Sequence, residues 1–349
     1  MDIINLVRPN IRELKAYSSA RDEFSGQAEV MLDANENPFN SPLNRYPDPL
    51  QKEIKQMVAG LKGTDPSRIF LGNGSDEAID LLFRIFCEPG KANVVSIVPT
   101  YGMYRVAADI NNIGVREVML GPGFELEKKR LLEACDDETR LIFLCSPNNP
   151  TANLLDRSTI LEVVRESNCI VVLDEAYIDF SSAKSLIGEL DHFPNLVILQ
   201  TFSKAWGLAG IRLGMAFASP LIIGLMNRVK YPYNISVLTK EAVIKALQDT
   251  DRVAGWVKTI LDERNRLTTA LAGNKLVVRV WPSEANFLLV QFTQPERVFA
   301  YLRDHSIIVR DRSRIILCEG ALRITVGTEE ENNRLLGALV RLEKEMNPL

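Results

Sequence analysis

A chain of 349 residues is long enough for two domains, and its 46% hydrophobic content is that of an ordinary globular protein. The formal net charge of −4 provides no basic surface for nucleic acid, and no apolar run approaches the roughly 18 residues of a membrane span. Because the five cysteines stand singly, only two histidines are present and the N-terminus mixes charged with apolar residues, we expect a cytoplasmic protein without disulfide framework, metal centre or signal peptide.

The first 30 residues are polar and mixed, so we expect an N-terminal arm with one short helix that packs with the small domain. Tyr17 is the one side chain of note there, most simply explained by packing. A strand-like start at residues 31–34 breaks at Asn37-Pro38, and the proline-rich loop 41–49, which carries Tyr46, must be extended. Apolar residues at helical spacing then predict a helix over residues 50–61.

A glycine-rich turn at residues 72–77 follows a short apolar run and precedes apolar residues at helical spacing up to Phe86. The first N–H groups of a helix lack partners and lie at the positive end of its dipole, so this turn, with Ser75 and Asp76, can bind an anion. A lone turn of this kind is more often an ordinary helix start. It lacks the GK[ST] ending of a Walker loop and is not GxGxxG, so it carries no nucleotide fingerprint.

Five further apolar runs are typical of buried strands: residues 93–98, 141–145, 169–173, 196–199 and 215–218. Since helical segments alternate with them, we predict a large α/β domain over residues 31–235, with a mostly parallel central sheet and helices on both faces. Polar side chains follow the runs directly: Tyr101, Asn149, Asp174, Tyr177, Ser203 and Lys204. The carboxyl ends of parallel strands meet at one edge of a sheet, so we expect these groups to share one crevice.

Lys204 is the centre of the functional prediction. A lysine that loses water in such a crevice has a lowered pKa and can form a Schiff base with an aldehyde. Arg212 and Ser203 suit a phosphate, and Asp174 suits a protonated pyridine nitrogen. Together these groups indicate pyridoxal 5'-phosphate (PLP) as a cofactor, whereas the alternative is a loop lysine that simply faces solvent.

The other polar residues of the crevice fit the same cofactor. Tyr101 can stack on its ring, and Asn149 and Tyr177 can hydrogen-bond its hydroxyl. Ser75 and Asp76, at the glycine-rich turn, can hold its phosphate. When the substrate amine has taken its place on the cofactor, Lys204 can move a proton at the substrate α-carbon, which completes the transfer of the amino group. We therefore expect the catalytic residues to be Lys204, Asp174 and Tyr177.

Residues 236–349 have the pattern of a smaller α+β domain. A long helical stretch over residues 237–271 is followed by strands near 275–281 and 286–292, a helix near 295–304, and strands near 306–310 and 321–326. Arg310 and Arg323 fall at or within these strands. An arginine in an apolar strand is costly unless it meets an anion, which is either a ligand or a neighbouring carboxylate.

Eight motifs stand in the order of one known family: LDANENP, RYPD, GNGSDE, PTYGMY, SPNNPT, DEAYIDF, SKAWGLAGIRLG and LRITVGT. On these motifs the chain resembles the fold-type-I, class-II PLP-dependent aminotransferases over nearly its whole length. It is most similar to the branch of that family that acts on histidinol phosphate. One position departs from the pattern, because Ala152 stands where the family usually has a glycine after SPNNPT. If that turn needs a positive φ, alanine strains it modestly.

The resemblance implies a homodimer that carries PLP on Lys204 and serves histidine biosynthesis. The reaction implied is transamination between histidinol phosphate and 2-oxoglutarate, which gives imidazole acetol phosphate and glutamate. The resemblance also implies that Tyr46 reaches the cofactor phosphate of the neighbouring subunit. Tyr17, Arg310 and Arg323 are then expected to receive the substrate's phosphate or the carboxylates of glutamate.

Other functions stay open on the same residues. A lyase similar to threonine-phosphate decarboxylase, or a broad-specificity aromatic aminotransferase, would share the PLP-binding groups and differ in the substrate pocket. A PLP-binding regulator is disfavoured, because such proteins usually carry a DNA-binding domain, and the chain has no spare length before Met31 and no basic patch. A Rossmann-type dehydrogenase is disfavoured because no dinucleotide fingerprint follows a first strand.

Overall fold

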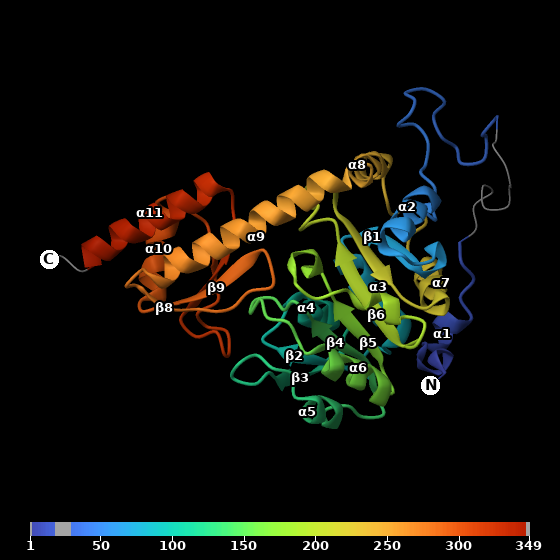
Figure 1. The fold of residues 1–349 in the computed structure, drawn as a ribbon. Helices are drawn as coiled ribbons and strands as arrows, with labels where there is room; N and C mark the ends of the chain where they lie inside the picture. The colour runs from blue at the N-terminus through green and yellow to red at the C-terminus, as the bar shows by residue number, and fades with distance from the viewer. Residues whose placement is uncertain (1, 18–28, 347–349) are drawn as a thin grey trace.

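The computed structural model describes residues 2–17 and 29–346, which form two β-sheets flanked by helices (Figure 1). The larger sheet has seven strands and the smaller sheet has four. The strands are β1 Ile69–Asn73, β2 Asn93–Val98, β3 Gly114–Met119, β4 Thr139–Cys145, β5 Ile170–Asp174, β6 Leu196–Thr201, β7 Leu213–Phe217, β8 Val277–Val280, β9 Phe287–Phe292, β10 Arg310–Asp311 and β11 Ala321–Thr325.

The helices fall between these strands and at both ends of the chain. The α-helices are α1 Pro9–Arg12, α2 Lys52–Lys62, α3 Ser75–Phe86, α4 Met103–Ile110, α5 Lys128–Glu133, α6 Arg157–Glu166, α7 Pro220–Val229, α8 Val237–Leu247, α9 Thr250–Ala272, α10 Pro295–Asp304 and α11 Glu329–Met346. The short 3-10 helices are η1 Ile3–Leu6, η2 Pro66–Arg68, η3 Ile178–Phe180, η4 Leu186–Glu189 and η5 Ala209–Ile211. Within the described residues, no helix combines the length and the apolar character needed to span a membrane.

Strand order in the larger sheet is β1-β7-β6-β5-β4-β2-β3. Strands β2 to β6 pair in parallel, whereas β7 runs antiparallel to both of its neighbours, β1 and β6. The predicted mostly parallel sheet is therefore confirmed. This order places the ends of β4, β5 and β6 side by side, and the segments that carry Asn149, Asp174 and Lys204 leave the sheet from these ends.

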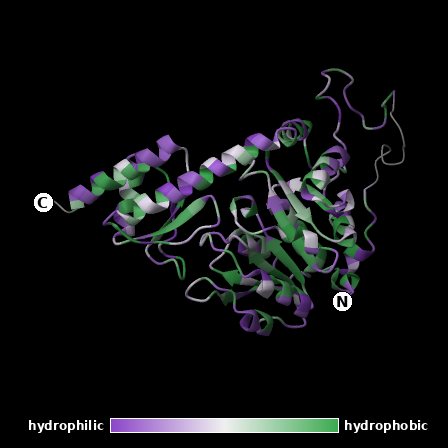
Figure 2. Cartoon of the chain, in the orientation of Figure 1, coloured by the Kyte–Doolittle hydropathy of each residue, from purple (hydrophilic) through white to green (hydrophobic). Residues whose placement is uncertain are grey.

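Both faces of the larger sheet are buried, because its strands send alternate side chains into two separate cores. In β5, Val171 and Leu173 join the core that packs against α2, α6 and α8, whereas Ile170 and Val172 join the core that packs against α3, α4 and α7. Near-continuous apolar strands are typical of parallel sheets covered on both faces. Figure 2 shows these strands as hydrophobic and the outer sides of the helices as mostly hydrophilic, which agrees with the predicted architecture.

The smaller sheet, with strand order β10-β11-β9-β8, is antiparallel throughout. It packs against α10, α11 and the C-terminal part of α9. Val253 of α9 lies in a core of the larger sheet, and Leu267 and Leu271 lie in the core of the smaller sheet, so one 23-residue helix links the two (Figure 1). The predicted division into an arm (1–30), a large domain (31–235) and a small domain (236–349) stays a prediction. The expected packing of the arm with the small domain is wrong for the described residues, because Ile3, Val7 and Ile11 lie in the core of the larger sheet with α3, α4 and α7.

Several predicted elements differ from the structure. The stretch 237–271 is two helices, because the Asp249 side chain accepts a hydrogen bond from the Arg252 N–H and caps α9 just after α8 ends. Of residues 306–310, only Arg310 pairs within the sheet, together with Asp311, because apolar alternation sets the buried face of a segment but does not provide a partner strand. Residues 31–34 form no strand. Strand β3 was not expected, because it is mostly exposed and contains no apolar run.

Candidate active site

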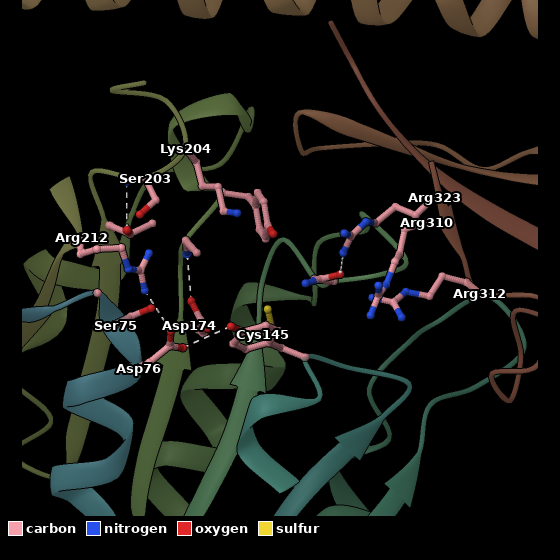
Figure 3. A pocket seen from close by; sticks show the side chains of 16 residues that line it. Ser75, Asp76, Cys145, Asp174, Ser203, Lys204, Arg212, Arg310, Arg312 and Arg323 are labelled. Atoms are coloured by element: carbon pink, nitrogen blue, oxygen red, sulfur yellow. Dashed lines mark hydrogen bonds and ion pairs between the residues drawn. The ribbon is translucent and has the colours of Figure 1, made fainter. Parts of the chain in front are cut away.

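A cavity of about 330 Å³ lies at the edge of the larger sheet where β4, β5 and β6 end, and the smaller sheet borders its other side (Figure 3). Most of the predicted site residues line it: Ser75, Asp76, Tyr101, Asn149, Asp174, Tyr177, Ser203, Lys204, Arg212, Arg310 and Arg323. These residues come from distant parts of the sequence. The parallel strand order is what brings them to one crevice.

Lys204 stands on the loop that follows β6, and Figure 3 shows its amine directed into the cavity. Burial, together with the Arg323 guanidinium, lowers the pKa of Lys204, and the Asp174 carboxylate opposes this shift. The Lys204 Nζ lies 5.4 Å from the centre of the Tyr177 ring. A lowered pKa increases the neutral fraction of the amine at any given pH, and the neutral amine is the form that attacks a carbonyl carbon.

Asp174 is the last residue of β5 and is only 3% exposed. The Tyr104 hydroxyl donates to its Oδ2 at 2.6 Å, and the Ala176 N–H donates to its Oδ1 at 3.0 Å. Burial raises the pKa of Asp174 even though both hydrogen bonds favour the charged form. A buried carboxylate that is held in place by neutral donors is suited to a cationic partner that enters from the cavity.

An anion cradle lies where the N-terminus of α3 meets β7. Gly74 precedes the helix at φ +74°, and no side chain caps the first turn, so the N–H groups at Ser75 and Asp76 lack a partner within the helix. A Cβ on Gly214 of β7 would lie 2.1 Å from the Ser75 nitrogen. The close approach of β7 to the helix start therefore requires glycine at position 214.

Side chains around this cradle hold one another in place. The Asp76 carboxylate accepts hydrogen bonds from the Tyr101 hydroxyl at 3.2 Å and from Arg212 Nη2 at 3.3 Å. The ion pair with Arg212 partly neutralises the Asp76 carboxylate, which would otherwise repel an anion in the cradle. The Ser203 N–H donates to the Thr201 Oγ1 at 3.0 Å, which fixes the start of the loop that carries Lys204.

The smaller sheet contributes arginines to the opposite side of the cavity. Arg310 on β10 lies directly across from Arg323 on β11, so both side chains leave the same face of the sheet. Arg323 Nη1 donates to the Asn149 Oδ1 at 2.5 Å, and burial lowers the pKa of Arg323. Neither arginine forms a salt bridge with a carboxylate of the described residues, so the alternative of an internal ion pair is not realised.

The turn after SPNNPT has the strained backbone that the sequence indicated. Ala152 is fully buried at φ +63°, where its N–H donates to the Asn148 carbonyl at 2.7 Å and its carbonyl accepts from the Glu284 N–H at 2.8 Å. An alanine in the left-handed region costs about 1–2 kcal/mol relative to right-handed backbone. Asn149 nevertheless lines the cavity, so the alanine leaves the site residue in place.

The two tyrosines of the N-terminal region lie outside the cavity. Tyr17 is 69% exposed and borders a separate hollow with Pro49 and Lys230. Tyr46 stacks on Tyr233, with ring centroids 4.5 Å apart and an interplanar angle of 19°. Their expected roles stay predictions, and the role of Tyr46 needs a second subunit.

Sequence reasoning missed several residues of the cavity and its wall: Gly74, Tyr104, Cys145, Ala176, Thr201 and Arg312. Cys145 and Thr201 are the last residues of β4 and β6, so the strand-end argument applied to them as well. Arg312 stands two residues after Arg310, a spacing that places both on one face of an extended chain. Tyr104 has no such signal, because its contact with Asp174 depends on how α4 packs.

Comparisons with known proteins agree on one family. The model for aminotransferase class I and II matches residues 20–339. The chain is 55% identical to histidinol-phosphate aminotransferase of Parabacteroides distasonis, over 98% of this chain and 99% of the relative, and 55% identical to that of Bacteroides thetaiotaomicron, over 97% and 98%. The crystal structure of histidinol-phosphate aminotransferase from Sinorhizobium meliloti in complex with pyridoxal-5'-phosphate is similar, with a TM-score of 0.81, 25% identity and 90% of each chain covered.

Proposed function

Because this chain belongs to the class I and II aminotransferase family, we propose that it is a PLP-dependent enzyme that transfers an amino group between histidinol phosphate and 2-oxoglutarate. The reaction is a step of histidine biosynthesis, and we place the enzyme in the cytoplasm. One observation carries the proposal: a single cavity holds a desolvated lysine, a buried carboxylate and an anion cradle at one side. At the other side it holds arginines that pair with no carboxylate in the described part of the chain (Figure 3).

The residues of the cavity fit the groups of PLP one by one. The cradle at the start of α3, with Ser203 and Arg212, would hold the phosphate, since its backbone N–H groups are uncapped and Gly214 leaves room for the close approach. Asp174 would hold the protonated ring nitrogen, because its buried carboxylate has only neutral donors. When bound, PLP supplies an electron-deficient ring that withdraws electrons from the substrate α-carbon.

Lys204 supplies the amine that attaches the cofactor and the base that serves the reaction. Its lowered pKa increases the neutral fraction of the amine at any given pH, so Lys204 could accept the proton of the substrate α-carbon and release it towards the bound cofactor. Tyr177 lies next to this amine and Asn149 lines the same cavity, so both can orient the cofactor through its hydroxyl. Tyr101, tied to Asp76, borders the space for the ring.

Arg310 and Arg323 are the groups that we assign to the distal anion of the substrate. Two adjacent guanidinium groups that pair with no carboxylate among residues 2–17 and 29–346 suit a phosphate or carboxylate better than an uncharged aromatic side chain. This argument favours histidinol phosphate over phenylalanine or tyrosine. The family resemblance also assigns Tyr17 to the substrate, although Tyr17 borders a separate hollow in this structure. We assign Tyr46 to the cofactor phosphate of a partner subunit in a homodimer, since Tyr46 does not line the cavity of its own chain.

The test is an assay of the purified enzyme, loaded with PLP, with histidinol phosphate and 2-oxoglutarate. We expect glutamate to form in proportion to the histidinol phosphate consumed, with Lys204→Ala as the inactive control. Histidinol phosphate has no carboxylate to lose, so a parallel assay uses threonine phosphate as substrate, and carbon dioxide release there would identify the lyase instead. Equal kcat/KM for phenylalanine and histidinol phosphate would identify a broad aromatic aminotransferase.

A further inference from the structure

We propose that Arg312 is a third phosphate-binding residue, which makes this site select phosphorylated amino donors over unphosphorylated ones. The inference rests on the proposed transamination and deepens it, because it assigns the choice of substrate to a residue outside the sequence motifs. It concerns the side of the cavity that the smaller sheet forms.

The strand geometry places Arg312 beside the two arginines already described. Arg310 and Arg312 are two residues apart in an extended segment, and the Arg312 N–H donates to the Ala321 carbonyl at 3.0 Å, which continues the pairing of β10 with β11. Alternate residues of a strand share a face, so Arg312 joins Arg310 and Arg323. Figure 3 shows the three side chains entering the cavity from the smaller sheet, opposite Lys204.

No side-chain hydrogen bond or salt bridge joins Arg312 to the residues that the structure describes. Its Nε is buried and has no hydrogen-bond partner among the described residues. The Asp311 carboxylate is next in the chain, but its Oδ1 accepts a hydrogen bond from the Ser313 N–H at 2.8 Å, and it alternates to the other face. Burial lowers the pKa of Arg312, and the neighbouring Arg323 and Arg310 lower it further. An arginine does not give up its proton in proteins, so this cluster needs an anion to balance it.

The number of guanidinium groups indicates which anion. A carboxylate carries one charge and two oxygens, which one guanidinium group can engage in a bidentate pair. A phosphate monoester carries about −1.5 to −2 charge at pH 7 and three free oxygens. Three guanidinium groups on one face therefore exceed the need of a carboxylate and match a phosphate. This is why removal of Arg312 should affect the phosphorylated donor most.

The experiment compares the PLP-loaded wild type with Arg312→Gln, Arg312→Lys and Arg314→Gln. Histidinol phosphate, unphosphorylated histidinol and glutamate are each used as amino donor in the half-reaction that transfers the amino group to the PLP-loaded enzyme without added acceptor, and kcat and KM of this half-reaction are measured separately. We expect Arg312→Gln to lower kcat/KM for histidinol phosphate about 10- to 100-fold, mostly through KM, and to change the values for histidinol and glutamate less than about threefold. Arg312→Lys keeps the positive charge but lacks the planar guanidinium group that can bind two oxygens at once, so its loss of kcat/KM should be smaller than that of Arg312→Gln.

Arg314→Gln is the matched control, because Arg314 is exposed and lies outside the cavity. It removes the same charge nearby and should leave all three donors unchanged. Thermal unfolding of each variant shows whether it is folded. If Arg312→Gln is unfolded, the kinetic constants of Arg312→Lys alone are compared with those of the wild type. An equal loss for all three donors, or no loss for histidinol phosphate, would overturn the role of Arg312.

Inorganic phosphate separates this inference from the proposed function. Phosphate should inhibit the wild type in competition with glutamate, and Arg312→Gln should raise its inhibition constant about 10-fold or more. If the wild type fails to use histidinol phosphate but this inhibition depends on Arg312, the proposed substrate is wrong and the phosphate site stands. If the wild type uses histidinol phosphate and Arg312→Gln changes neither measurement, only the inference on Arg312 fails.

Discussion

Gly214→Ala should damage cofactor binding, although residue 214 offers no functional group. The added Cβ would lie 2.1 Å from the Ser75 nitrogen and 2.2 Å from the Gly74 carbonyl carbon, more than 1 Å inside the 3.4 Å of an ordinary contact. Both neighbours are backbone atoms, so β7 and the start of α3 must move apart. Overpacking of this kind costs about 1–3 kcal/mol of folding stability. The same displacement removes the N–H groups of α3 from the phosphate position.

The loss of one hydrogen bond to a charged phosphate corresponds to about 1.5–3 kcal/mol, which is roughly a 10- to 100-fold weaker affinity for PLP. Affinity is measured by titrating the apoenzyme with PLP and following the absorbance of the bound cofactor, and stability is measured by urea unfolding of the apoenzyme. Gly210→Ala is the matched control, since a Cβ there meets nothing within 4 Å. If Gly214→Ala bound PLP within threefold of the wild type, the cradle would not depend on the close approach of β7 to α3.

Four further predictions concern individual side chains. Lys204→Ala should abolish the visible absorbance of PLP bound to the lysine and all turnover, and an unchanged spectrum in the variant would refute the assignment. In the wild type, the rate at which PLP attaches to Lys204 should rise as the pH passes through the lowered pKa of this lysine, because the neutral amine is the reactive form. Asp174→Asn should retain PLP but lose about 100-fold or more in kcat, and a near-normal kcat would remove Asp174 from the ring nitrogen. Tyr46→Phe keeps the ring that stacks on Tyr233 but removes the hydroxyl that is expected to reach the partner's cofactor phosphate, so the affinity of the dimer for PLP should fall about 10-fold. A monomeric form of the protein that binds PLP as tightly as the dimer would contradict this role. Ala152→Gly should raise the free energy of unfolding by up to about 1 kcal/mol in urea, because it relieves the backbone at φ +63°; a loss of stability would show that packing of the buried methyl group is worth more than the strain.

Residues that follow buried strands could be predicted well, because an apolar run marks a strand and the parallel arrangement determines where its end lies. Lys204, Asp174 and Asn149 were expected in one crevice on this argument, and all three line the cavity. The role of Tyr104 could not be predicted from the sequence, because its hydrogen bond to Asp174 depends on how α4 packs against the sheet. β3 was missed because an exposed edge strand lacks the apolar run by which buried strands are recognised.

Contacts between chain segments that carry no periodic signal could not be predicted. The break between α8 and α9 depends on one capping side chain, Asp249, inside a pattern that continues as helix on both sides. Arg312 has the spacing of a residue that shares the face of Arg310, but its place in the cavity follows from the pairing of its N–H with Ala321. Tyr17 and Tyr46 lie outside the cavity, and their roles, substrate binding for Tyr17 and contact with a second subunit's cofactor for Tyr46, stay predictions.

The amine, the buried carboxylate and Arg212 stand on or next to strands of the larger sheet, whereas Arg310, Arg312 and Arg323 stand on or next to β10 and β11 of the smaller one. Exchange of Arg310 and Arg312 could therefore change the amino donor while Lys204, Asp174 and the cradle at α3 stay in place. Arg323 is the exception, because it donates a hydrogen bond to Asn149 and lowers the pKa of Lys204. A directed-evolution library restricted to β10 and β11 should consequently yield variants with altered donors that still retain their cofactor.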